Sequence, residues 1–121
     1  MHEMGIAEAV LDAVRAEAQR LACGHVYKVA VRIGELAGVA PDSLSFCFEA
    51  LVKGTEMEPL TLEIHYCPRQ FQCRKCGRSF SAEIEGLPCP ECGGEDSFFV
   101  GGDELDIAYL EVEDGARTTG T

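Results

Sequence analysis

Four cysteines in two closely spaced pairs are the residues of this sequence best suited to hold a metal ion. Cys73 and Cys76 form one pair, Cys89 and Cys92 form the other, and a glycine follows the second cysteine of each. Two residues between thiolates let one tight turn present both sulfurs to a tetrahedral ion, and the glycine permits the positive φ that continues the turn. Two such turns complete four-coordination. The spacing therefore predicts a closed, structural zinc site.

Other chemistries of paired cysteines fit less well. A disulfide framework is disfavoured because the chain has seven cysteines, an odd number, and because its opening lacks the basic and apolar regions of a secretory signal. A thioredoxin-like redox site uses one pair at the start of a helix, whereas both pairs here fall in turns rich in Gly and Pro. Iron in a rubredoxin-like site would use the same four thiolates and stays open.

Three cysteines remain outside the two pairs. Cys47 falls on an apolar helical stripe and Cys23 at the end of a helix, where a thiol behaves as a small buried hydrophobe. Cys67 precedes Pro68 and is either a spare metal ligand or a structural residue, and the structural role is favoured.

The first three residues offer a second, different metal chemistry. The α-amine of Met1, the amide nitrogen of His2 and its imidazole Nδ1 can close fused chelate rings around one ion, and the Glu3 amide or carboxylate can complete the shell. A planar nitrogen field suits Ni(II) and Cu(II) better than Zn(II). The amine titrates at about 7.7–8.0 and the imidazole at about 6.5, so affinity should fall as the pH drops below neutrality. By itself the motif is weak, since an acidic Glu3 is also favourable near a helix N-terminus.

Alternating hydrophobic patterns indicate the elements that position these sites. Helical periodicity predicts one helix over residues 4–22 and a second that begins at Pro41 and ends at Gly54. Alternation predicts strands over residues 26–33, 60–66 and 104–113. The first strand, second helix and second strand form a plausible crossover unit. We expect an α+β fold, a small three-stranded sheet with two helices on one face, plus an inserted zinc-ribbon module with four cysteine ligands.

The same order divides the chain. Residues 1–66 and 100–114 would form the αβ domain that carries the N-terminal chelate motif, residues 67–99 the inserted zinc-binding domain, and residues 115–121 a flexible tail. The zinc module has too few apolar residues to fold alone, so metal binding would supply most of its folding energy.

Length and composition exclude several classes of protein. The chain has 121 residues, of which 46% are hydrophobic and 26% charged, which rules out a large multidomain enzyme and a disordered tail. A formal charge of -11 disfavours binding to nucleic acid and to anionic membranes. No segment approaches the roughly 20 apolar residues of a bilayer span, and we expect a cytoplasmic chain with reduced thiols.

These features also occur together in a known family. Met-His-Glu-Met at residues 1–4, the segments 31–36, 44–49 and 101–105, and the two cysteine pairs closely resemble the HypA/HybF family of hydrogenase nickel-incorporation proteins over nearly the whole chain. Gly5 stands where the family usually has Ser, a difference that removes no expected ligand.

The resemblance implies a nickel metallochaperone for [NiFe]-hydrogenase maturation. Ni(II) would be transient cargo at Met1, His2 and Glu3, and structural Zn(II) would bind the four paired cysteines. The implied partners are a HypB-type GTPase accessory protein, the hydrogenase large subunit and, in some organisms, urease maturation factors. No catalytic activity, nucleic acid or membrane is expected, and Glu3 is either a ligand or a partner contact.

An alternative function comes from a basic cluster beside the first cysteine pair. A zinc ribbon that binds nucleic acid or transcription machinery would use it on phosphate. Nearby acidic residues and the charge of a zinc tetrathiolate argue against that role. The cluster comprises Arg69, Arg74, Lys75 and Arg78.

Overall fold

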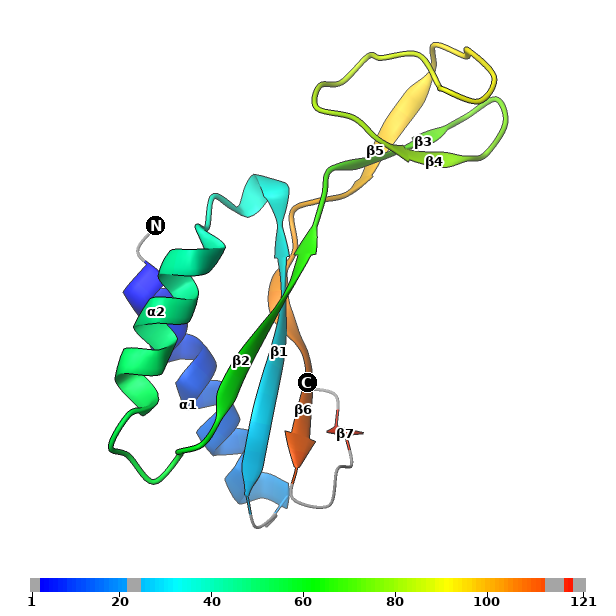
Figure 1. Ribbon diagram of the computed structural model, residues 1–121. Coiled ribbons are helices and arrows are strands. Elements are labelled where there is room, and N and C mark those ends of the chain that lie inside the picture. Colours follow the sequence, from blue (N-terminus) through cyan, green and yellow to red (C-terminus); the bar gives the residue numbers. More distant parts are fainter. Residues whose placement is uncertain (1–2, 22–24, 113–116, 119–121) are drawn as a thin grey trace.

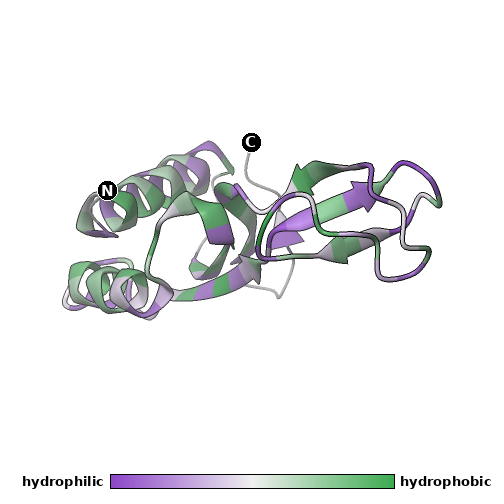
Figure 2. Cartoon of the chain, turned by 90° about the horizontal axis from the view of Figure 1, so that it is seen from above, coloured by the Kyte–Doolittle hydropathy of each residue, from purple (hydrophilic) through white to green (hydrophobic). Residues whose placement is uncertain are grey.

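The computed structural model describes residues 3–21, 25–112 and 117–118. Two helices cover one face of a four-stranded sheet, and a second, three-stranded sheet projects from one end of the first (Figure 1). Seen from above, both helices lie on the same side of the first sheet (Figure 2). The expected α+β class and the helices on one face are confirmed.

Both helices form where the apolar periodicity predicts them. Helix α1 spans Glu3–Leu21 and buries Ala7, Leu11 and Val14, which lie three or four residues apart on one face. Helix α2 spans Pro41–Val52, begins with the proline at its first position and buries Leu44, Phe48 and Val52. A 3-10 turn over Glu35–Ala37 connects strand β1 to α2.

The first sheet has the order β2-β1-β6-β7. Strand β1 (Val26–Gly34) pairs in parallel with β2 (Thr61–Cys67), as expected when a helix crosses between them, and antiparallel with β6 (Leu105–Val112). The three predicted strands are therefore confirmed.

A fourth strand in this sheet was not expected. Strand β7 (Arg117–Thr118) pairs with Leu110 and Glu111 of β6, so at these two residues the predicted flexible tail is wrong. A polar strand of two residues is too short to show alternating apolar and polar residues, so the sequence gives no signal for it.

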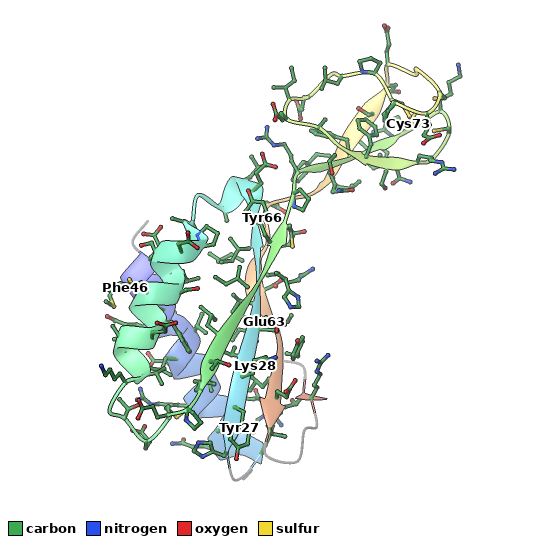
Figure 3. The ribbon with its side chains drawn as sticks, viewed as in Figure 1. Tyr27, Lys28, Phe46, Glu63, Tyr66 and Cys73 are labelled. Atoms are coloured by element: carbon green, nitrogen blue, oxygen red, sulfur yellow. The ribbon has the colours of Figure 1, made fainter. Side chains whose placement is uncertain are left out.

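The two faces of the first sheet differ in character. Val29, Val31 and Ile33 of β1 point toward the helices and are buried with Leu110 of β6 in the main core. Alternate residues of the same strands face away from the helices, and Lys28 and Glu63 lie together on that polar face (Figure 3). The register is therefore fixed by burial of one face only.

The second sheet is inserted between β2 and β6 and has the order β4-β3-β5. Its strands are β3 (Gln70–Cys73), β4 (Ser79–Ser81) and β5 (Ser97–Gly101). Strand β2 runs one residue beyond the predicted boundary at 66, and β5 two residues beyond the one at 99. The division into two domains stays a prediction.

No helix among the described residues is long and apolar enough to cross a membrane.

Candidate metal centre

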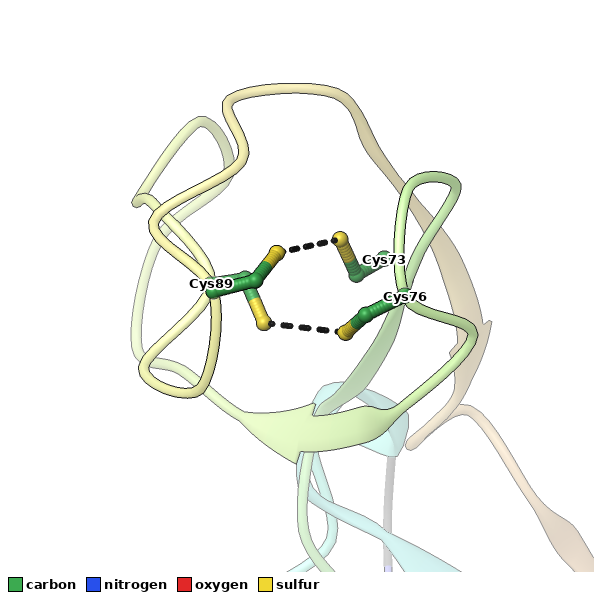
Figure 4. Close-up of side chains that lie close together, drawn as sticks. Cys73, Cys76 and Cys89 are labelled. Carbon is green, nitrogen blue, oxygen red and sulfur yellow. Dashed lines mark hydrogen bonds between the residues drawn. The ribbon is translucent and has the colours of Figure 1, made fainter.

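The structure brings together the four cysteines that the spacing selected. Their Sγ atoms all lie within 4.8 Å of one another, with 3.6 Å between Cys73 and Cys92 and 3.7 Å between Cys76 and Cys89 (Figure 4). A tetrahedral zinc ion with Zn–S bonds of about 2.3 Å requires sulfurs about 3.8 Å apart. The donor set and its spacing therefore fit a structural zinc ion.

Two turns of the same construction present these sulfurs. The amide of Gly77 donates to the carbonyl of Cys73 at 2.9 Å, and the amide of Gly93 donates to the carbonyl of Cys89 at 2.8 Å. Both glycines have the positive φ that the spacing predicts, 79° and 74°. A residue with a Cβ would be strained in this conformation. The expected pair of cysteine turns is therefore present.

Hydrogen bonds from the turns tune the thiols. The backbone N–H of Cys76 lowers the pKa of Cys73 to about 7, and the backbone N–H of Cys92 lowers the pKa of Cys89. The backbone N–H of Arg78 acts in the same direction on Cys76, but burial and the neighbouring thiols outweigh it and raise that pKa to about 11. A divalent cation among the four sulfurs favours the thiolate form of each.

The surroundings of the site match a structural role. Cys73 and Cys89 are buried, while Cys76 and Cys92 are exposed. Phe71 is buried in the small sheet beside them, and its ring contacts those of Phe80 and Phe99. With four protein ligands no position remains for a substrate, which separates this site from catalytic zinc centres.

The three other cysteines stand apart from this cluster. Cys47 packs half-buried against the main core, as expected. The thiol of Cys67 donates to the carbonyl of His65 at 3.6 Å, and Cys67 is not part of the metal-capable cluster found among the described residues. Cys23 lies outside those residues.

Of the predicted nickel ligands, the structure describes Glu3 alone. Met1 and His2 lie outside the described residues. Glu3 begins α1, and its Oε2 accepts a hydrogen bond of 3.2 Å from the amide of Ala40, the residue before α2. The N-terminus of α1 thus lies beside that of α2, a contact between residues far apart in sequence that no local pattern could predict.

The basic cluster of the alternative function is partly neutralised. Arg69 pairs with Glu35 at 2.8 Å and Arg74 with Asp96 at 3.4 Å. The Arg74 guanidinium also lies over the ring of Phe98, at 4.4 Å from its centroid. Two of the four cations are thus engaged within the chain, which weakens the case for a phosphate-binding surface.

A helix-covered lobe joined to a tetracysteine module with a closed metal site defines a metal-binding protein of the zinc-ribbon type. Comparison with known proteins narrows this class. Residues 1–112 match the model of the family described as HypA, hydrogenase/urease nickel incorporation, metallochaperone. The chain belongs to this family of nickel metallochaperones.

Individual relatives agree over nearly their full length. A protein named hydrogenase maturation factor HypA from Streptomyces avermitilis is 44% identical over 117 residues, which cover 95% of this chain and 89% of that relative. One from Dehalococcoides mccartyi strain CBDB1 is 36% identical over 98% of this chain and 100% of its own.

Solved structures share the fold at low identity. The solution structure of the Ni metallochaperone HypA from Helicobacter pylori matches with a TM-score of 0.62 at 20% identity, covering 93% of this chain and 97% of that chain. A second solution structure, titled HypA protein, matches with the same coverage, a TM-score of 0.65 and 19% identity.

Proposed function

We propose that this chain carries Ni(II) at Met1, His2 and Glu3 and delivers it for maturation of [NiFe]-hydrogenase. Membership of the nickel-incorporation family carries the proposal, and the N-terminal chelate motif supplies the site. Amine, amide and imidazole nitrogens suit Ni(II), and two of these groups take up protons near neutral pH. Such a site releases its metal, as a delivery protein requires.

The zinc site would retain its metal, whereas the nickel site would release it. Four thiolates from Cys73, Cys76, Cys89 and Cys92 would hold Zn(II) without an open position, and the ion would supply the cross-link that organises both cysteine turns. The chain would then carry one permanent and one transient metal.

The contact of Glu3 with Ala40 bears on its role in the nickel site. A carboxylate that accepts a hydrogen bond at the start of α2 is less available to a metal than the backbone amide of the same residue. We therefore assign the amide of Glu3, not its carboxylate, to the nickel shell.

Membership of the family supports the finer functional assignments. The chain would act without catalysing a reaction, in the cytoplasm, with a HypB-type GTPase and the hydrogenase large subunit as partners and urease maturation as a second destination. The acidic charge of -11 supports protein partners over nucleic acid.

Delivery can be tested directly. Nickel-loaded protein is mixed with nickel-free hydrogenase large subunit, the two are separated, and the nickel in each is measured. Transfer to the large subunit from the wild type, with none from a His2→Ala variant exposed to the same nickel, is the expected result. Equal nickel in the large subunit with both proteins would contradict the proposal.

A further inference from the structure

Both chain connections between the two sheets pass beside a single loop. The chain leaves the first sheet after Cys67, passes Arg69 into β3, and returns from β5 through Gly102 to β6. The loop that follows β1 lies against both crossings, at the junction visible in Figure 1. The hydrogen bonds of this loop reach both crossings, one at Arg69 and the other at Gly102.

Glu35 of this loop holds the first crossing. Its Oε1 accepts a hydrogen bond of 2.9 Å from the backbone amide of Arg69, and its Oε2 accepts one of 2.8 Å from the guanidinium of the same residue. Both side chains are largely covered, with exposures of 30% and 25%. The two bonds from Arg69 lower the pKa of Glu35, so its carboxylate is charged at neutral pH. One carboxylate thus holds both the backbone and the side chain of Arg69.

Backbone bonds from the last residue of β1 and from the same loop hold the second crossing. The amide of Leu36 donates to the carbonyl of Gly102 and the amide of Gly34 to that of Glu104, each at 2.7 Å. A Cβ on Gly34 would lie 2.2 Å from the Gly102 oxygen, so the two backbones meet at a distance that only glycine allows. These contacts hold the returning chain against the first sheet at the base of the zinc module.

The far end of the loop reaches the N-terminal site. The chain continues through Gly38, whose φ is 72°, to Ala40, and the amide of Ala40 bonds to the carboxylate of Glu3. Glu35 and Ala40 are therefore the two anchored ends of one short segment, residues 35–40. One end is bonded to Arg69, where the chain enters the zinc module, and the other to Glu3, a residue of the proposed nickel site.

We propose that Glu35 is a positioning residue that fixes the orientation of the zinc module, and that residues 35–40 transmit changes at Glu3 to that orientation. The first half depends only on the contacts described above. The transmission from Glu3 through residues 35–40 matters for function only if Glu3 belongs to the nickel site, so it rests on the proposed function.

The first half is tested by the relative orientation of the two sheets in the zinc-loaded full chain, measured by residual dipolar couplings. We expect one alignment tensor to fit both sheets in the wild type and in Glu83→Gln, a matched loss of charge on the zinc module. Glu35→Gln should require two separate tensors, while the shifts of β1 and of the cysteine turns stay unchanged. Arg69→Gln removes the guanidinium bond and leaves the bond from the backbone amide, so it should depart from a single tensor less than Glu35→Gln does. A single tensor in both variants overturns the proposal.

The second half is tested without nickel, through the amide resonance of Arg69. Glu3→Ala should shift this resonance, Glu8→Ala at an exposed position of α1 should not, and the shift should vanish when Glu35→Gln is also present. If the amide resonance of Arg69 does not shift in Glu3→Ala, transmission through the loop is refuted. Failure of nickel to bind the N-terminus would refute the proposed function and leave these two results unaltered, so the two failures are distinguishable.

Discussion

Tyr109 reaches across a whole strand to bond with Glu63. The phenol of Tyr109 on β6 donates to Glu63 Oε2 on β2 at 2.8 Å, and Ala30 of the intervening β1 pairs in register with both residues. Because the side chain of Ala30 is small, the side chains of Tyr109 and Glu63 can meet above it. Lys28 and His65 also bond to Glu63, at 3.1 and 2.6 Å, so one carboxylate ties together three strands of the polar face.

This network predicts an acid-sensitive contribution to stability. The bonds from His65, Tyr109 and Lys28 lower the pKa of Glu63 from 4.5 to about 2. A carboxylate whose pKa is lowered on folding stabilises the protein above its unfolded value, and this contribution disappears as the pH falls from about 4.5 to about 2. Glu63→Gln should therefore melt at a lower temperature than the wild type at pH 7, and the difference should shrink across that window.

The matched control is Tyr109→Phe, which removes one of the three bonds and leaves the charge. Its melting temperature should lie between those of the wild type and Glu63→Gln at pH 7. A gap between Glu63→Gln and the wild type that stays constant down to pH 2 would show that the carboxylate contributes through packing alone.

Two phenylalanines of α2 provide a test of the core. Phe48 is fully buried among the helices and the sheet, whereas Phe46 is 73% exposed and projects from α2 away from the sheet (Figure 3). Phe48→Ala should lower the free energy of unfolding by about 3–5 kcal/mol because it leaves a cavity. Phe46→Ala should change it by no more than about 0.5 kcal/mol. Chemical denaturation of both variants checks the pair, and equal losses would contradict the observed orientation of α2.

Zinc removal should unfold one part of the chain only. Of the described residues 70–101, Phe71 is the one large apolar side chain that is buried, so the small sheet depends on its metal. A strong chelator should abolish the dispersed amide resonances of residues 70–101 and preserve those of β1 and both helices. Retention of the module resonances after complete zinc loss would mean that its strands fold without the ion.

The zinc ligands themselves are tested by metal analysis under reducing conditions. Cys73→Ser should lose zinc, because three thiolates and a hydroxyl make a poorer tetrahedral set, and Cys67→Ser should retain one ion per chain. Iron in place of zinc in the purified protein, or full zinc in Cys73→Ser, would overturn the assignment.

Local patterns predicted the two helices, three strands and the clustering of four cysteines, because apolar periodicity and the spacing of cysteine pairs are properties of short segments. The strands of the small sheet escaped prediction, since Ser79–Ser81 and Gln70–Cys73 are too short and polar to alternate clearly. Contacts such as that of Glu35 with Arg69 join residues 34 positions apart. They depend on topology, and a single sequence gives no signal for them.

A calorimetric titration with Ni(II) shows whether the N-terminus of the chain binds nickel. Three proteins are compared near pH 7.5: the tag-free chain, its His2→Ala variant, and the chain with two residues added before Met1. The tag-free chain should bind one nickel ion outside the zinc site, more weakly as the pH falls toward 6, because the amine and imidazole then hold protons. Both altered proteins should lose this site while keeping their zinc. Equal nickel affinity in all three would place the cargo elsewhere in the chain and exclude a nickel site at Met1, His2 and Glu3.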